Sequence, residues 1–118
     1  MVETAAKTIL LCDDTSDIRE ALGVMLRQEG YSVLLACDAG DCMTQLASAE
    51  PDLLLLDVRM PDHDGFWVAE MLQDTRRRIP IIFITAYDRP LYRVYAPLIG
   101  AAYYLIKPVR PEVLLETI

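Results

Sequence analysis

The sequence predicts an α/β fold, with an open, doubly wound parallel sheet covered by helices on both faces. Two apolar runs without alternation, residues 9–12 and 53–56, are typical of strands that are buried on both sides of a sheet. Such runs alternate along the chain with patterns of helical spacing, as expected for successive βα units with right-handed crossovers. At 118 residues, the chain is expected to form one domain, spanning residues 1–118.

The first predicted helix follows a strand at residues 8–12 and ends at Gly30. Its apolar side chains recur at helical spacing: Ile18, Leu22, Met25 and Leu26. Asp17 and Glu20 are placed like a capping pair at its start, and glycine is a common stop. Residues 1–7, before the first strand, are expected to be a loose start.

The middle of the chain predicts two more strands, each followed by a helix. Residues 31–37 form the second strand, and Asp38 is placed to cap a second helix that runs to about residue 49. Pro51 and Asp52 then turn the chain into the strand at 53–56. A longer loop follows, and the third helix runs from residue 66 to about residue 77.

The last third of the chain predicts strands at residues 81–84 and 102–106, with a helix between them and another after them. The fourth helix covers residues 90–99, and Pro111 opens the fifth. Pro97 lacks a backbone N–H and crowds the preceding turn, so the fourth helix is expected to be short or kinked. Its predicted inward stripe is Leu91, Val94, Tyr95 and Leu98, and its predicted outward residues are Arg89, Tyr92, Arg93 and Ala96.

The composition is that of a soluble, acidic globular chain. Its 18 acidic and 11 basic residues give a net charge of -7, which would repel a nucleic-acid backbone, so no direct nucleic-acid binding is expected. Since no apolar stretch approaches the ~18 residues of a membrane span and no signal-peptide pattern opens the chain, we expect a cytoplasmic protein without membrane contact. The cysteines are odd in number and lack metal-site spacing, so we expect them to be buried and reduced: Cys12, Cys37 and Cys42.

Polar side chains follow four of the predicted strands at the edge where open α/β sheets bind ligands. Asp13 and Asp14 follow the first strand, and Asp57 follows the third. Thr85 follows the fourth strand, and Lys107 follows the fifth. Because the carboxyl ends of parallel strands meet at one edge of a sheet, we expect these side chains to converge.

The predicted cluster suits a hard cation and a phosphoryl group. Three ionised carboxylates a few ångströms apart would raise one another's pKa values unless cations compensate, and a divalent ion together with Lys107 would neutralise them. Mg²⁺ is the natural candidate, because one or two carboxylates usually hold it together with phosphate oxygens. Asp57 is then a candidate nucleophile that forms an aspartyl phosphate, while the Thr85 hydroxyl and backbone N–H groups donate to the phosphoryl oxygens.

With these residues in place, the chain resembles the response regulator receiver domains of bacterial two-component signalling. The resemblance covers nearly the whole chain and rests on four motifs in order: LLCDD, LLLLDVRMPDHDG, IIFITA and YYLIKP. It implies a flavodoxin-like, five-stranded sheet with strand order 2-1-3-4-5. It also implies that the last helix, which is short for the family, is truncated in this chain.

The resemblance assigns a role to each residue of the acidic cluster. It implies that Asp57 is the phosphoacceptor. Asp14 and Asp57 would ligate Mg²⁺ directly, together with the main-chain carbonyl of Arg59, and Asp13 would hold a water molecule bound to the ion.

The resemblance also implies how the switch would work. Lys107 would contact the phosphoryl group, and Thr85 would move toward it. Tyr104, three residues before the lysine, would be the aromatic switch residue that turns inward when the threonine shifts. The peptide bond between Lys107 and Pro108 would be cis and would direct the lysine into the site.

The implied function is a phosphorylation-dependent signalling switch. A cognate histidine kinase or phosphotransfer protein would supply the phosphoryl group, and a downstream protein or an attached output domain would respond to the changed conformation. Phosphorylation would change the charge at Asp57 from -1 to about -2. The chain is not expected to be an enzyme beyond promoting its own phosphorylation and dephosphorylation, and homodimer formation is left open.

Two other classes of protein share part of this pattern. A degenerate receiver that acts as a phosphorylation-independent interaction module would have no need of the acidic cluster, Thr85 and Lys107. A phosphohydrolase of the haloacid dehalogenase type needs a second acid two positions after its nucleophile, where this chain has Arg59. Arg59 is either a solvated side chain or a group that pairs with the acyl phosphate and alters its lifetime.

Overall fold

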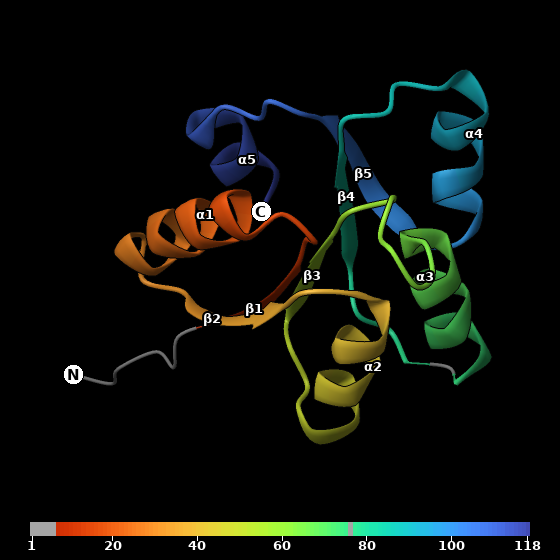
Figure 1. Cartoon of the computed structure of the whole chain (residues 1–118), viewed down its shortest axis with the longest axis horizontal. Helices are drawn as coiled ribbons and strands as arrows, with labels where there is room; N and C mark the ends of the chain where they lie inside the picture. Colours follow the sequence, from red (N-terminus) through yellow and green to blue (C-terminus); the bar gives the residue numbers. More distant parts are fainter. Residues whose placement is uncertain (1–6, 76) are drawn as a thin grey trace.

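Five parallel strands form one sheet at the centre of the molecule, in the order β2-β1-β3-β4-β5 (Figure 1). The computed structural model describes residues 7–75 and 77–118. The strands are β1 (Thr8–Cys12), β2 (Ser32–Ala36), β3 (Leu53–Leu56), β4 (Ile81–Thr85) and β5 (Ala101–Ile106). The predicted flavodoxin-like order is confirmed, and it places β1 and β3, which both end in acidic residues, side by side.

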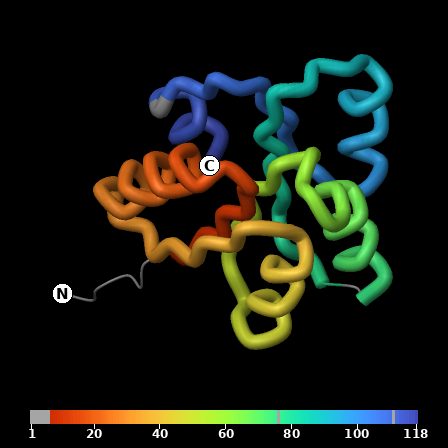
Figure 2. The backbone as a smooth tube through the Cα atoms, viewed as in Figure 1, coloured from red at the N-terminus to blue at the C-terminus, as the bar shows by residue number. Residues whose placement is uncertain are grey.

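Helices cover both faces of the sheet, as predicted. The helices are α1 (Ser16–Gln28), α2 (Ala39–Ser48), α3 (Gly65–Asp74), α4 (Pro90–Leu98) and α5 (Pro111–Thr117). Helices α1 and α5 lie on one side of the sheet, and α2, α3 and α4 lie on the other (Figure 1). The chain ends beside α1 (Figure 2), where Ile118 packs against the same apolar cluster as Leu22 and Met25.

The four leucines of β3 explain why the central strand is buried on both faces. Leu54 and Leu56 belong to the apolar cluster beneath α2, α3 and α4, while Leu53 and Leu55 belong to the cluster beneath α1 and α5. Each buried leucine contributes about 1.5–3 kcal/mol relative to an exposed one. The strand therefore needs apolar side chains at every position. Asp57, the residue that follows it, lies at the carboxyl edge of the sheet.

Most helix boundaries agree with the prediction, but the predicted cap of α1 and the predicted end of α3 are wrong. Asp38 caps α2 as predicted, since its side chain accepts a hydrogen bond from the Asp41 N–H, and Gly30 follows α1 with a φ of 96°. The predicted capping pair of α1, Asp17 and Glu20, is not formed, because the helix begins at Ser16 and Thr15 occupies the cap without a side-chain hydrogen bond.

Helix α3 ends at Asp74, three residues before the predicted end at Arg77. Arg77 leaves the helix because its guanidinium caps the end of α2: Nη1 and Nη2 donate to the carbonyl oxygens of Leu46, at 2.5 Å, and Ala49, at 3.0 Å. These carbonyls would otherwise lack partners at a helix end. Residues 1–6, where a loose start was expected, lie outside the described part of the chain, as does position 76.

Helix α4 turns the opposite face to the sheet from the one predicted. Ala96 and Ile99 are buried, and the predicted inward stripe is exposed: Leu91 by 79%, Val94 by 64%, Tyr95 by 37% and Leu98 by 71%. Both tyrosines lie edge-on to Phe66, Tyr92 at 5.1 Å and Tyr95 at 5.2 Å between centroids, and the small Ala96 is buried. The helix is thus packed through its tyrosines and Ala96 and not through its aliphatic residues. The helix is short, as predicted, with Pro97 near its end and Gly100 beyond it at a φ of 92°.

The structure also bears on the expected burial of the cysteines. Cys12 and Cys42 are buried, whereas Cys37 is exposed, so burial of all three cysteines is wrong. Across residues 7–75 and 77–118, the structure contains no helix of the length and apolarity that a bilayer span requires.

Candidate functional site

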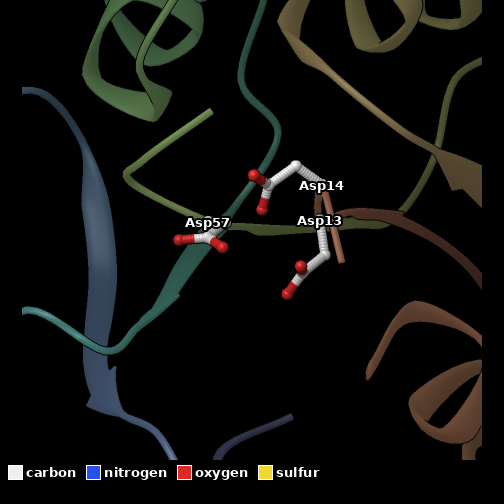
Figure 3. Close-up of side chains that lie close together, drawn as sticks. All are labelled: Asp13, Asp14 and Asp57. Carbon is white, nitrogen blue, oxygen red and sulfur yellow. The ribbon is translucent and has the colours of Figure 1, made fainter. Parts of the chain in front are cut away.

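Three carboxylates meet at the carboxyl ends of β1 and β3, as the sequence predicts. Parallel pairing places Cys12 opposite Leu56, and the Asp57 N–H donates to the Cys12 carbonyl at 3.0 Å, so the residues that follow the two strands are neighbours. One carboxylate oxygen each from Asp13, Asp14 and Asp57 lies within 4.8 Å of the others (Figure 3). Asp13 and Asp57 are buried and Asp14 is exposed, so the cluster opens to solvent on the side of Asp14.

Lys107 bridges the two buried carboxylates. Its Nζ donates to Asp13 Oδ2 at 2.7 Å and to Asp57 Oδ2 at 2.9 Å. The lysine follows β5, where its N–H donates to the Thr85 carbonyl at 2.8 Å, and its peptide bond to Pro108 is cis, as predicted. Burial works to lower the pKa of Lys107, but the hydrogen bonds to Asp13 and Asp57 outweigh it and the pKa is raised. The ammonium therefore stays charged and holds the two acids together.

The pKa of Asp57 is raised above that of an ordinary aspartate. Burial is the main cause; the neighbouring Asp13 charge adds to it, while the Lys107 ammonium and the Arg59 N–H oppose it. With Asp13, Asp14 and Asp57 ionised and Lys107 charged, the cluster carries a formal charge of -2. A divalent cation would neutralise this charge and lower the cost of ionising Asp57.

We expect Asp57→Asn to stabilise the metal-free protein at neutral pH. Because the pKa of Asp57 is higher in the folded than in the unfolded state, stability is lost as the pH rises from the unfolded value of about 3.9 through the folded one. Asparagine does not ionise, so the variant does not lose this stability as the pH rises. Urea unfolding without Mg²⁺ should show the variant to be more stable at about pH 7, with the difference shrinking toward pH values below about 3.9. A difference that is constant with pH would exclude this explanation.

The loop from Val58 to Asp64 carries Arg59 and is closed tightly on the acceptor. The Arg59 N–H donates to Asp57 Oδ1 at 3.2 Å, and the Gly65 N–H donates to the Val58 carbonyl at 2.8 Å. An added Cβ at Gly65 would lie 2.3 Å from the Asp57 carbonyl oxygen, so only glycine fits here. We call residues 58–64 the acceptor loop.

Thr85 and Tyr104 are connected through a residue that the sequence analysis did not assign to the site. The buried Thr85 hydroxyl oxygen accepts a hydrogen bond from the Tyr87 N–H at 3.2 Å, and the Tyr104 hydroxyl donates to the Tyr87 carbonyl at 2.7 Å. The backbone of Tyr87 thus contacts both predicted switch residues. The only sequence feature that could have indicated a role for Tyr87 is its position two residues after Thr85. Spacing alone does not reveal a backbone contact of this kind.

The Arg59 side chain contacts the same residue, Tyr87. Its guanidinium carbon lies 4.9 Å from the centroid of the Tyr87 ring, within cation–π distance. The Arg59 side chain is exposed to solvent, as one of the two readings held, and it also contacts an aromatic ring. His63 lies in the acceptor loop and stacks on Trp67 with 3.9 Å between the ring centroids.

The oxygen donors of the cluster fit a hard divalent cation. Asp13, Asp14 and Asp57 offer carboxylate oxygens close together, one of them facing solvent, and no thiol or imidazole is among these donors. This donor set favours Mg²⁺ over a softer metal. The Arg59 carbonyl remains a predicted ligand.

Comparison with known protein families matches residues 9–118 to the response regulator receiver domain. The chain belongs to this family. Receiver domains are phosphorylation-dependent switches of two-component signalling, and the predicted family, fold and general function are confirmed.

Curated relatives and solved structures agree with the assignment to receiver domains. The response regulator MprA of Mycobacterium avium (strain 104) is 43% identical over 107 residues, which cover 91% of this chain and 47% of MprA. A CheY-like receiver domain structure from Methanospirillum hungatei JF-1 is 32% identical and has a TM-score of 0.90, covering 95% of this chain and 90% of the other.

A further solved structure is the response regulator TrrA of Thermotoga maritima in complex with Mg²⁺ and BeF. It is 33% identical, with a TM-score of 0.83, and the match covers 93% of this receiver domain and 94% of TrrA. The chain spans about half the length of the curated relatives that it matches.

Proposed function

We propose that Asp57 accepts a phosphoryl group from a cognate histidine kinase or phosphotransfer protein, and that Mg²⁺ is required. The observation that carries the proposal is the Lys107 ammonium held between Asp13 and Asp57, beside the solvent-facing Asp14. In the transfer, an Asp57 oxygen forms a bond to phosphorus while the bond between phosphorus and the donor nitrogen breaks. The developing negative charge is matched by the Lys107 ammonium already in place.

The metal would be held by oxygen ligands on the open side of the cluster. We propose Asp14, Asp57 and the Arg59 main-chain carbonyl as direct ligands, with Asp13 acting through a water molecule. When bound, Mg²⁺ would neutralise charge on the phosphoryl oxygens.

The proposed switch begins at Thr85 and passes through Tyr87. A phosphoryl group at Asp57 offers the Thr85 hydroxyl an acceptor, and turning toward it would release the Tyr87 N–H. The Tyr87 carbonyl then moves as well, and Tyr104 loses the acceptor that its hydroxyl now uses. The loop after β4, α4 and β5 form the two-state element that a downstream protein or an attached output domain would respond to. We place these events in the cytoplasm.

A second proposal concerns the length of the protein. The curated relatives are about twice as long as this chain, and an output segment is the simplest use of their remaining length. We therefore propose that the chain acts as the receiver part of a response regulator.

The experiment that tests the function is incubation with acetyl phosphate, with and without Mg²⁺, followed by intact-mass spectrometry. A receiver should gain one phosphoryl group only with the metal, and beryllofluoride with Mg²⁺ should change its conformation. A degenerate interaction module would ignore both reagents, and a phosphohydrolase would turn over added phosphoesters. If the protein ignores both reagents, the proposed phosphoryl transfer is wrong. If it turns over added phosphoesters, phosphohydrolase activity replaces the proposed switch function.

We expect Arg59→Ala to change the lifetime of the acyl phosphate. The Arg59 guanidinium lies over the Tyr87 ring, and we propose that it shields the acyl phosphate at Asp57 from attacking water. Dephosphorylation of the variant should be faster by a few-fold, about the effect of losing a ~1 kcal/mol cation–π contact. The control is Arg110→Ala, an exposed arginine at the start of α5. Equal rates in the native protein and in Arg59→Ala would reject the role.

A further inference from the structure

The acceptor loop is tied to the N-terminus of α2 by Asp62. The Asp62 carboxylate accepts two backbone hydrogen bonds: Oδ1 from the Ala39 N–H at 3.1 Å and Oδ2 from the Gly40 N–H at 2.8 Å. These N–H groups belong to the first turn of α2, where no intrahelical partner exists for them. An acid of the acceptor loop therefore completes the cap of a helix 22 or more residues earlier in the sequence.

The capping residue of α2 does not satisfy the N–H groups of Ala39 and Gly40, which donate to Asp62 instead. The helix has its own capping residue, Asp38, but the Asp38 side chain accepts from the Asp41 N–H at 2.7 Å. The Ala39 and Gly40 N–H groups are thus satisfied from outside the helix. Removal from water works to raise the pKa of Asp62, but the N–H groups that it accepts from outweigh this effect and lower the pKa.

A second contact joins the same loop to the same part of the fold. The Cys12 Sγ lies 3.3 Å from the Met60 Sδ in the loop and 3.3 Å from the Asp38 carbonyl oxygen at the helix cap. Met60 anchors the acceptor loop to Cys12 and Asp62 anchors it to the start of α2, while the Gly65 N–H closes the end of the loop on Val58. Arg59 lies between these fixed points.

We propose that Asp62 is a positioning residue, which holds the acceptor loop on α2 and thereby places the Arg59 carbonyl as a ligand of the divalent cation. The inference rests on the proposed metal site and adds a residue that itself contacts neither metal nor phosphoryl group. Without the tether, the loop between Asp57 and Asp64 has fewer fixed points, and the carbonyl must be ordered when the ion binds. That ordering reduces the affinity.

The glycine at position 40 allows the tether to be broken from the opposite side. A Cβ at Gly40 would lie 3.2 Å from Asp62 Oδ2, so a branched side chain there should displace the carboxylate while its charge is retained. The variant Gly40→Val also replaces the poorest helix former after proline by a better one, so the helix propensity of α2 is not reduced.

The test is a calorimetric titration with Mg²⁺ in the absence of any phosphodonor. Asp62→Ala and Gly40→Val should each raise the dissociation constant about tenfold, the lower end of the range for residues that orient metal ligands. Asp62→Asn should lie between them and the native protein, because its amide oxygen keeps one of the two N–H partners. Asp64→Asn is the charge control: it removes an acid from the same loop but retains an acceptor for the Trp67 N–H.

The possible results distinguish three cases: Asp62 positions the loop, Asp62 acts only through its negative charge, or the proposed metal site is wrong. If Asp62→Asn and Asp64→Asn weaken binding equally and Gly40→Val leaves it unchanged, Asp62 acts only as a negative charge and the inference is wrong. It is also wrong if every variant binds like the native protein. If the native protein itself does not bind Mg²⁺, the proposed metal site is wrong, and the role of Asp62 fails with it. Circular dichroism confirms that each variant is folded.

Discussion

Asp57→Asn will abolish phosphorylation by acetyl phosphate, while the domain stays folded. The amide of asparagine is not a nucleophile for phosphorus, because its lone pair is delocalised, whereas its oxygen still accepts a hydrogen bond from Lys107. The change therefore removes the acceptor and keeps the bridge to the lysine. Intact-mass spectrometry after incubation with acetyl phosphate and Mg²⁺ should show one added phosphoryl group in the native protein and none in the variant.

The control for this experiment is Asp64→Asn. Asp64 lies seven positions after the acceptor and caps α3 through the Trp67 N–H, and asparagine is an equally good cap. This variant should be phosphorylated like the native protein. If Asp57→Asn still gains a phosphoryl group, and that group maps to Asp13 or Asp14, the acceptor has been assigned to the wrong carboxylate.

Gly65→Ala is expected to have the largest effect on stability among conservative substitutions near the site. The added Cβ would lie 2.3 Å from the Asp57 carbonyl oxygen and 3.1 Å from the Phe83 ring. The first of these atoms is backbone, so it cannot move aside without shifting the acceptor. We expect a loss of about 3 kcal/mol in urea unfolding, the upper part of the range for overpacking, and slower phosphorylation of the protein that remains folded.

A matched glycine separates this effect from the general consequence of adding a methyl group to a helix. Gly23 lies inside α1, where a Cβ would meet the end of the Leu35 side chain at 3.3 Å. That side chain is flexible, and alanine favours helix by up to about 1 kcal/mol over glycine. Gly23→Ala should therefore be close to neutral. Similar losses in both variants would mean that the close approach at Gly65 carries no special cost.

The sequence predicts the sheet and the central cluster well because both depend on strong local contrasts. The four leucines before Asp57 are bounded by polar residues, so β3 is predicted to the residue. Parallel order then brings Asp57 beside Asp13 with no further information. Lys107 is found in the same way, because it directly follows an apolar strand.

The failures come from contacts that have no local pattern. The aliphatic residues of α4 suggested an inward stripe, but the helix packs through Ala96 and through its two tyrosines, which both lie edge-on to Phe66. Likewise, Asp62 reads as one polar residue in a polar loop, and its partners at Ala39 and Gly40 are known only once the loop is placed against α2. Such pairings depend on tertiary structure and cannot be recovered from spacing.

The inverted face of α4 determines how firmly this helix is attached. Its large aliphatic residues, Leu91, Val94 and Leu98, stay in water, so the helix buries mainly Ala96 and part of Tyr92 against the domain. Since local opening costs free energy in proportion to the apolar contacts that are broken, detaching α4 costs far less than opening β3. The rearrangement proposed at Thr85 would therefore need less free energy to move this helix than to disturb the sheet.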